Sequence, residues 1–302
     1  AHIDVSESDF TGVHQILGFE VVKTFQAIIQ AEKMVLVREE ALEAITAAHE
    51  VGQARYEAGD LLQQDVLNLE LQQSRAKENL IKSKHTLELT KRSFLNLLGL
   101  REGSVVISQE EGAQLLLPEV RDFSNRHELK RLEALIVSAQ AELEKAQGGK
   151  MPTIDAFASY QVDKGWELDG NGDSWIAGLR MDYNLFDGQK NSSEITLARL
   201  KLQELEGHMN KLQLALNFEL EQAQLDYEQV KQRLEVTRQM ITVAEEVTRL
   251  SRVRFKEGLI LASDLIDFEM RLSDAQARHL AANAAYQLAI ANLRRATGLA
   301  QF

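Results

Sequence analysis

The chain has 302 residues, with 46 acidic against 34 basic side chains and a formal net charge of -12 at pH 7. This balance argues against a nucleic-acid partner, because there is no basic face to neutralise phosphates. The sequence contains no Cys, which excludes disulfides and thiolate metal sites. Only two Pro, few aromatic residues and abundant helix formers favour long helices over a globular α/β core. No apolar run approaches the roughly 20 residues of a membrane-spanning helix.

The front of the chain predicts a helical hairpin. Residues 1–18 give a weak signal, whereas residues 19–57 are expected to be helical. The apolar side of this helix comprises Val22, Phe25, Ile29, Leu36 and Ala47. Gly59 is placed to end the helix in the left-handed conformation that Gly adopts cheaply. A returning helix is expected over residues 61–98.

That returning helix carries an apolar seam with a period of 3.5 residues, which is typical of a coiled coil. The seam residues are Val66, Leu69, Gln73, Ala76, Leu80, Ser83, Leu87, Thr90, Phe94 and Leu97. Residues 99–125 break the pattern with Gly and Pro, so they are interpreted as a linker. Helical spacing resumes over residues 126–147 and stops at Gly148.

Two later runs alternate between apolar and polar residues, as β-strands with one wet face do. They span residues 153–163 and 175–187. Each is about as long as the 9–11 residues that cross a bilayer as a tilted strand. Each also carries aromatic residues near its ends, as interfacial girdles do. A soluble hairpin with one wet face would show the same alternation.

In a membrane, the charged residues decide how this hairpin is oriented. An Arg that faces lipid at mid-bilayer costs roughly 2–4 kcal/mol. Arg180, Asp182 and Asn184 are therefore expected to face a watery barrel lumen, with Trp175 and Leu179 towards lipid. Two strands alone leave unpaired edges, which hydrocarbon does not tolerate. Only a barrel closed by several chains or by a second hairpin solves this.

Residues 192–256 are interpreted as one helix of about 65 residues, roughly 95 Å long. Its first seam runs through Leu212, Leu216, Leu220, Ala223, Tyr227, Val230, Leu234, Thr237, Ile241 and Ala244. A second seam runs through Val236, Met240, Val243, Val247 and Leu250. A dimeric coiled coil needs one seam, so two seams indicate a neighbour on each side, as in a cylinder of helices. A bundle core would also give two seams.

The last turn and helix repeat an earlier stretch without a gap. The matched pairs are Arg55/Arg254, Tyr56/Phe255, Gly59/Gly258, Asp65/Asp264, Glu70/Glu269, Ser74/Ser273, Ala76/Ala275, Gly99/Gly298 and Leu100/Leu299. The later seam comprises Leu265, Phe268, Leu272, Ala275, His279, Ala282, Tyr286, Ala289, Leu293 and Ala296. A register held over this span indicates an internal duplication. Residues 126–258 lead up to the second turn but only residues 1–59 to the first, so the chain is expected to be N-terminally incomplete, without its first β-hairpin.

The sequence offers no enzymatic constellation. The His residues are dispersed, and there is no HExxH pair, Walker loop or G-x-S-x-G motif. We therefore expect no catalysis, no cofactor and no metal site. The informative acids are Asp264 and Asp267, with Asp65 and Asn68 in the other repeat, because residues three apart share a helix face. For Asp65 and Asp264 a second role stays open, since acids in a first helical turn stabilise it by roughly 0.3–1 kcal/mol.

The duplicated Tyr/Phe-x-x-Gly turns, the long helices after them and the closing Leu-Leu-Gly-Leu and Ala-Thr-Gly-Leu segments resemble the TolC-like outer-membrane efflux proteins. These are the trimeric exit ducts of Gram-negative export systems. The resemblance covers nearly the whole chain. It implies a mainly α fold, in which long antiparallel helices form a trimeric α-barrel and the β-hairpin contributes to a transmembrane β-barrel. It also implies passive efflux, in the bacterial outer membrane and extending into the periplasm.

The resemblance further implies a pore entrance and partners. In such ducts, acids at the start of the returning helix surround the periplasmic entrance, and here the matching residues are Asp264, Asp267, Asp65 and Asn68. The implied partners are two further copies of the chain, outer-membrane lipid, a periplasmic adaptor (membrane fusion protein) and an inner-membrane transporter. The adaptor is expected to contact the helix-turn tips, which comprise Tyr56, Gly59, Phe255 and Gly258.

The chain departs from the family at the latch that holds this entrance closed. In the best-known member a Tyr occupies the position of Phe255 and an Arg lies near Ile260. Neither Phe255 nor Ile260 has a side chain that can form a hydrogen bond. The sequence therefore predicts that this latch is absent or replaced.

The expected domains are residues 1–98 (first-repeat helices), 99–125 (linker), 126–152 (first helix of the second repeat), 153–187 (transmembrane β-hairpin) and 188–302 (long helices of the second repeat). The alternative to a duct is a soluble periplasmic coiled-coil scaffold or an adaptor protein. An adaptor would need β-rich domains flanking one helical hairpin, and nothing in the sequence supplies them.

Overall fold

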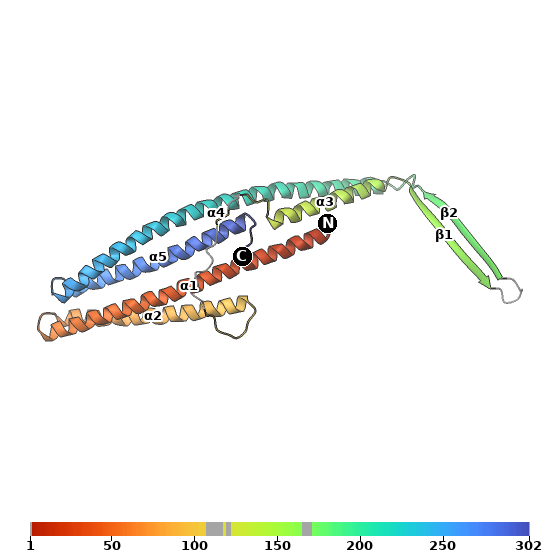
Figure 1. Cartoon of the computed structure of the whole chain (residues 1–302). Helices are drawn as coiled ribbons and strands as arrows, with labels where there is room; N and C mark the ends of the chain where they lie inside the picture. Colours follow the sequence, from red (N-terminus) through yellow and green to blue (C-terminus); the bar gives the residue numbers. More distant parts are fainter. Residues whose placement is uncertain (1, 107–116, 119–121, 165–170, 302) are drawn as a thin grey trace. The chain divides into compact units, whose positions relative to one another are not determined.

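The computed structural model describes residues 2–106, 117–118, 122–164 and 171–301. The described part of the chain is mainly helical with one β-hairpin (Figure 1). Its elements are α1 (His2–Glu57), α2 (Gln63–Leu97), α3 (His127–Gly148), β1 (Thr153–Lys164), β2 (Asn171–Asp182), α4 (Lys190–Lys256) and α5 (Ala262–Ala296). The fold class expected from the sequence, long helices with a hairpin inserted before the longest of them, is confirmed.

The chain divides into two compact units. One comprises residues 1–9 and 127–214, and the other comprises residues 10–126 and 215–302. In the second unit, the hairpin of α1 and α2 lies alongside the hairpin formed by the end of α4 and by α5 (Figure 1). Near the two turns they share a core of Ile45, Ala48, Leu69, Phe255, Ala262 and Leu265. The duplicated sequence thus folds as two hairpins packed side by side.

The seams predicted for the two returning helices are confirmed. Every residue predicted for the seam of α2 is buried or half-buried, and the same holds for α5. In α5, Ala275, Ala282, Ala289 and Ala296 recur once per heptad and are all buried. Such small side chains let the facing helix approach closely, which suits a long antiparallel pair.

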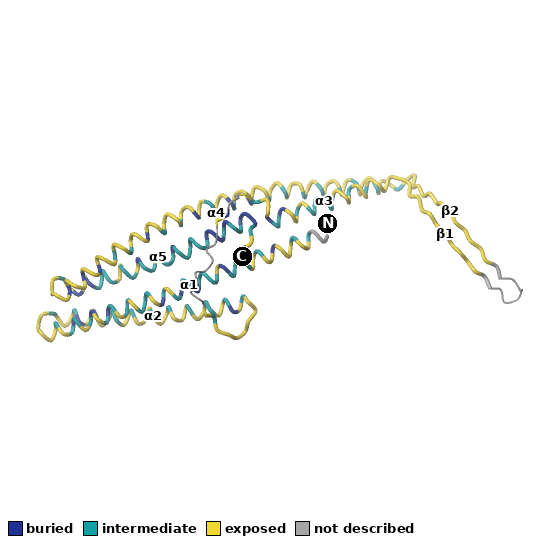
Figure 2. The backbone as a smooth tube through the Cα atoms, in the orientation of Figure 1, coloured by how far each residue is buried: buried dark blue, intermediate teal, exposed yellow. Residues whose placement is uncertain are grey.

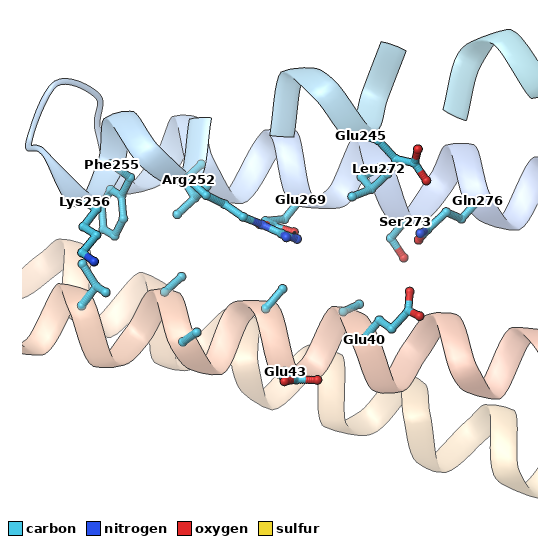
Figure 3. Close-up of a pocket in the computed structure, with 16 residues that line it drawn as sticks. Glu40, Glu43, Glu245, Arg252, Phe255, Lys256, Glu269, Leu272, Ser273 and Gln276 are labelled. Atoms are coloured by element: carbon cyan, nitrogen blue, oxygen red, sulfur yellow. The ribbon is translucent and has the colours of Figure 1, made fainter. Parts of the chain in front are cut away.

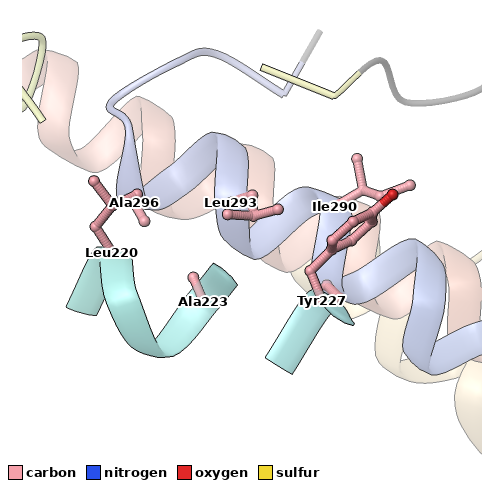
Figure 4. Close-up of a cluster of buried hydrophobic side chains, with 7 residues drawn as sticks. Leu220, Ala223, Tyr227, Ile290, Leu293 and Ala296 are labelled. Carbon is pink, nitrogen blue, oxygen red and sulfur yellow. The ribbon is translucent and has the colours of Figure 1, made fainter. Parts of the chain in front are cut away.

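The first seam of α4 packs against α5. Leu220, Ala223 and Tyr227 face Ile290, Leu293 and Ala296 (Figure 4). The rings of Tyr227 and Tyr286 lie 5.7 Å apart between centroids and are tilted by 34°. Burying each large apolar side chain contributes about 1.5–3 kcal/mol, so this cluster accounts for much of the hairpin's stability.

The second seam of α4 is uncovered in the single chain. Its residues are exposed as follows: Val236 56%, Met240 41%, Val243 64%, Val247 37% and Leu250 43%. We call these five residues the α4 stripe. All of them except Leu250 line, together with part of α5, a groove of about 550 Å³. The long helix therefore has one apolar side that packs within the chain and another that does not.

The helix α1 begins earlier than the sequence predicted. It starts at His2 rather than near residue 19. Phe10, Val13 and Ile16 are all more than half exposed, so this stretch lacks the buried stripe on which helix prediction relies. Two residues placed on the apolar side of α1, Leu36 and Ala47, are also exposed, so that part of the prediction was wrong. Within the expected linker, residues 99–125, residues 107–116 and 119–121 lie outside the described residues.

The β-hairpin pairs in an antiparallel register that separates its two faces. Ile154↔Met181, Ala156↔Leu179, Ala158↔Ala177 and Tyr160↔Trp175 form one apolar face. The opposite face carries Asp155↔Arg180 and Phe157↔Gly178. A β-carbon on Gly178 would stand 3.0 Å from the Phe157 ring, so the ring occupies the space that Gly178 leaves. The described parts of both strands are largely exposed (Figure 2).

The second strand, Asn171–Asp182, begins and ends earlier along the chain than the predicted residues 175–187. It ends at Asp182, whereas the sequence predicted that it continues to Asp187. Asn184 therefore lies beyond the strand, and its assignment to the barrel lumen stays a prediction. The alternation of Tyr183 to Phe186 resembled a strand, but β1 offers these residues no partner because Thr153, its first residue, already pairs with Asp182.

Among the described helices, none combines the length and apolar character needed to cross a bilayer.

Candidate channel entrance

The two helical hairpins close with the same backbone geometry. In the first turn, the N–H of Asp60 donates to the carbonyl of Arg55 at 2.8 Å and that of Gly59 to the carbonyl of Tyr56 at 3.0 Å. In the second turn, Leu259 donates to Arg254 at 2.8 Å and Gly258 to Phe255 at 3.0 Å. This pair of bonds is the Schellman closure of a helix C-terminus.

Both closures need Gly at the left-handed residue. The φ angles of Gly59 and Gly258 are +84° and +78°, a region that costs other L-residues roughly 1–2 kcal/mol. The predicted turn positions are therefore the positions at which the chain reverses.

The helices that follow begin without a side-chain cap. The residues before them, Leu62 and Leu261, are extended and offer no hydrogen-bonding side chain. Asp65 and Asp264 lie in the first turns of α2 and α5. Carboxylates there interact favourably with the unpaired N–H groups of a helix start. The structural role left open for these two acids is therefore supported by their placement.

A groove of about 470 Å³ lies between the two turns. It is lined by Gly59 and Asp65 from the first repeat, by Gly258 and Asp264 from the second, and by Arg55. Both turn glycines and both first-turn acids predicted from the duplication thus line the same groove. The other two predicted entrance residues, Asp267 and Asn68, do not line this groove.

Asp267 is partly neutralised within its own helix. Its carboxylate lies 2.7 Å from the Nη2 atom of Arg271, one turn further along α5. The Asp267 side chain is 48% exposed, and such exposed pairs contribute little to stability. The negative charge therefore remains near the turn but is shared with a cation. Asn68, its counterpart in α2, is exposed and carries no charge.

The aromatic residues of the two turns differ in their surroundings. Tyr56 is 40% exposed, whereas Phe255 is 2% exposed and belongs to the shared core of the hairpins. Around the groove, Leu62, Leu259 and Leu261 are each more than 60% exposed. The apolar surface at the tips is thus supplied by leucines that were not predicted from the sequence. Their position beside the turn glycines could have identified them.

A second groove, of about 620 Å³, lies between α1 and the α4/α5 hairpin (Figure 3). Glu40 and Glu43 of α1 lie on one side, and Glu245, Arg252 and Glu269 on the other (Figure 3). Between them, small residues of α1, including Ala41, Ala44 and Ala48, keep the groove open.

An ion pair fastens one wall of this groove. Arg252 of α4 donates through Nε and Nη2 to the two carboxylate oxygens of Glu269 of α5, the second bond at 2.8 Å. The hydrogen bond with Glu269 raises the pKa of Arg252, although burial opposes it. Arg252 therefore stays charged and holds α4 against α5. The repeat pair Glu70/Glu269 was visible in the sequence, but this partner was not.

On the β-hairpin, the expected lumen residues form a small charged cluster. Arg180 Nε lies 3.2 Å from an Asp182 oxygen, and Arg180 Nη2 lies 3.9 Å from Asp155 on the facing strand. These three side chains share the face opposite the apolar one. Asn184 lies outside this cluster, beyond the end of β2.

Comparison with protein families identifies this architecture. A family model described as "Outer membrane efflux protein" matches residues 123–299. The chain belongs to the outer membrane efflux protein family. The recognition made from the duplicated turns is therefore confirmed, and the protein is an efflux channel of the bacterial outer membrane that extends into the periplasm. The family is one of channels rather than enzymes.

Solved structures of outer-membrane efflux channels share the fold of this family member. The outer membrane protein VceC from Vibrio cholerae has 17% sequence identity and a TM-score of 0.80, covering 99% of this chain and 74% of that one. CusC has 14% identity and a TM-score of 0.84, covering 98% and 71%. The open state of the MtrE channel from Neisseria gonorrhoeae has 16% identity and a TM-score of 0.80, covering 98% and 68%. No curated protein sequence matched the chain.

Proposed function

We propose that three copies of this chain close into one tube, with an acid-lined entrance at the paired turns. The observation that carries this proposal is the α4 stripe. It repeats with the coiled-coil period and is uncovered, while the other seam of the same helix is buried. A helix with two apolar sides needs a neighbour on each of them, and covering each large side chain contributes about 1.5–3 kcal/mol. A neighbouring copy supplies that cover.

The entrance acids give this tube its selectivity. In a trimer, Asp264 and Asp267 would contribute two carboxylates from each of three protomers around one opening. A carboxylate about 6 Å from a passing cation attracts it by about 0.7 kcal/mol in water. Rings of Asp and Glu favour cation passage for this reason. Asp65, which lines the same inter-turn groove as Asp264, adds to the field.

The lumen of the transmembrane β-barrel is proposed to be polar where Arg180 and its two acidic neighbours lie. The Arg180, Asp182 and Asp155 cluster faces away from the apolar side of the hairpin. Placing that cluster towards water avoids the roughly 2–4 kcal/mol that an Arg costs when it faces lipid. Trp175, Leu179 and Met181 then face the lipid.

The exposed residues at the helix-turn tips indicate where a partner protein binds. The exposed Leu62, Leu259 and Leu261 surround a groove between the turns, and contiguous exposed apolar surface of this kind marks interaction sites. We assign this surface to a periplasmic adaptor, which in turn meets an inner-membrane transporter. Phe255 is buried in the core, so Tyr56 is the aromatic residue available to that adaptor.

Ion selectivity tests the entrance assignment. The protein is reconstituted into planar bilayers, and the reversal potential is measured across a KCl gradient at low ionic strength, where screening is weak. The Asp264→Asn, Asp267→Asn double variant is expected to lower the cation-to-anion permeability ratio by a factor of about three or more. Neutralising Asp267 also frees the positive charge of Arg271.

The control is Asp274→Asn, on the same helix but further from the turn, where Asp274 pairs with Arg278 at 2.7 Å. It is expected to keep the wild-type reversal potential. If the double variant has the same selectivity as the control, the acids do not line the entrance.

A further inference from the structure

Arg55 reaches from the first hairpin to the second. Its Nη1 donates to the backbone carbonyl of Phe255 at 2.9 Å, and its Nη2 donates to the carbonyl of Asp60 at 3.3 Å. The guanidinium carbon also lies 5.3 Å from the centroid of the Phe255 ring. One side chain therefore contacts the end of α4 and the turn that follows its own helix.

The carbonyl that Arg55 contacts suits a cation. Phe255 lies in the last turn of α4, where carbonyl groups lack helical partners and carry the negative end of the helix dipole. That oxygen already accepts the N–H of Gly258, and its second lone pair is open to Arg55. The rigid fork of a guanidinium can serve two acceptors at once, which an ammonium group on a flexible stem does less well. Arg55 thus caps a helix that belongs to the other hairpin.

The matching residue of the second repeat has no such role. Arg254 occupies the duplicated position and closes its own turn through its backbone carbonyl, as Arg55 does. The Arg254 side chain is exposed, and within the described residues it makes no hydrogen bond or ion pair. The two arginines are equivalent in sequence but only one joins the hairpins.

The turn glycines show the same asymmetry. A β-carbon at Gly258 would stand 3.1 Å from the Nη2 atom of Arg55. At Gly59, nothing lies within 4 Å of such an atom. The close approach of Arg55 therefore adds a constraint at the second turn that the backbone angle alone does not explain.

We propose that Arg55 is a positioning residue that fastens the two helix turns to each other, so that they move as one unit. The link ends on a backbone carbonyl and does not depend on a polar side chain at residue 255 or 260. It therefore supplies a connection that Phe255 and Ile260 cannot make. The role at the channel entrance rests on the proposed function, whereas the link between the turns does not.

The test is the distance between the two turns. Spin labels are placed at Glu57 and Glu257, which are exposed and lie just before the two turn glycines. The labelled protein is mixed with an excess of unlabelled protein so that only one labelled copy is present per assembly. Pulsed electron–electron double resonance then gives the distribution of distances. Wild type is expected to give a single narrow distribution, and Arg55→Ala a broader one.

Matched variants make the outcome specific. Arg254→Ala removes the same side chain from the other repeat and is expected to keep the wild-type distribution. Arg55→Lys keeps the charge but not the fork, and is expected to broaden the distribution. Circular dichroism checks that each variant is folded, and Arg55→Lys is decisive when Arg55→Ala is not folded. A wild-type distribution in a folded Arg55 variant overturns the proposal.

A second readout separates this inference from the proposed function. In planar bilayers, Arg55→Ala is expected to shift the equilibrium between conductance levels by on the order of tenfold, the effect of losing a charge-assisted hydrogen bond. Unchanged conductance levels in a variant with broadened distances overturn the entrance role of Arg55. A wild-type protein that forms no pores contradicts the proposed function, and the distance measurement still decides whether the link exists.

Discussion

Gly52 of α1 faces Leu69 of α2 so closely that a β-carbon on Gly52 would stand 2.6 Å from Leu69 Cδ1. Leu69 is fully buried and belongs to the core shared by the two hairpins, so its side chain has little room to move. A Gly inside a helix costs about 1 kcal/mol relative to Ala. The close approach of α2 to α1 explains why a Gly occupies residue 52, an interior position of a helix.

The first prediction follows from this contact. Gly52→Ala gains about 1 kcal/mol of helix propensity but overpacks the core, which typically costs about 1–3 kcal/mol. We expect a net loss of about 1 kcal/mol in the free energy of unfolding. Thermal denaturation followed by circular dichroism measures it.

Gly207→Ala is the control, because Gly207 lies inside α4 and nothing is within 4 Å of a β-carbon there. It is expected to stabilise the protein, by up to about 1 kcal/mol. If both substitutions stabilise the protein equally, Gly52 and Leu69 do not form a tight contact.

The duplicated glycines at the ends of α2 and α5 give a second prediction. Gly99 and Gly298 have φ angles of +74° and +75°, so an Ala at either residue costs roughly 1–2 kcal/mol of backbone strain. At Gly298 a β-carbon would also stand 2.6 Å from the backbone carbonyl carbon of Asn125, and at Gly99 it would meet nothing within 4 Å. Gly298→Ala is therefore expected to lower the unfolding midpoint clearly more than Gly99→Ala. Equal losses would show that the residues before α3 do not pack against this turn.

The α4 stripe gives a third prediction, on assembly. Val243→Glu places a charge in the surface that we assign to the neighbouring copy, and burying an unpaired carboxylate there is strongly unfavourable. The variant is expected to run as a monomer in native mass spectrometry while its helical content is unchanged, because Val243 is 64% exposed in the single chain.

Thr242→Glu is the matched control. Thr242 is exposed and adjacent in sequence, but it projects about 100° away from Val243 around the helix. It is expected to leave the assembly intact. Loss of assembly in both variants would point to a general effect of charge and not to the stripe.

A fourth prediction concerns acid. The pKa values of Glu78, Glu204 and Glu246 are lowered, in each case first by a hydrogen bond from a nearby Lys or Arg on the same helix. A carboxylate whose pKa is lowered in the folded state stabilises the fold. This stabilisation is fully present at a pH above the unfolded-state pKa of 4.5, and it is lost as the pH falls through the folded-state pKa. The melting temperature is therefore expected to decrease as the pH is lowered below 4.5. High salt screens exposed pairs, so the fall should be smaller in concentrated NaCl; an equal fall would assign it to other groups.

The sequence predicted those parts of the fold that repeat. The seams of α2 and α5 were found because each apolar residue recurs with the coiled-coil period, and both turns were found because Gly59 and Gly258 stand in register. The first turns of α1 were missed because Phe10, Val13 and Ile16 are exposed and give no one-sided pattern. Periodicity reports regular apolar spacing whether or not a partner covers it in the single chain, and the second seam of α4 was found in this way although it is exposed.

The candidate site was predicted less completely. Asp65 and Asp264 were found from the duplication, and the structure places both beside one groove. The contacts of Arg55 and Arg252 could not be predicted, because each reaches another helix at a distance that the sequence does not encode. The end of β2 at Asp182 was missed because the alternation continues past the last residue that β1 can pair.

The most direct test of the central claim is an electron cryomicroscopy reconstruction of the protein purified from outer membranes. We expect threefold-symmetric particles with an open axis, in which the α4 stripe of each copy is covered by a helix of the next. A monomer with Val236, Met240 and Val243 exposed to solvent, or an assembly that buries the stripe without enclosing a channel, would contradict it.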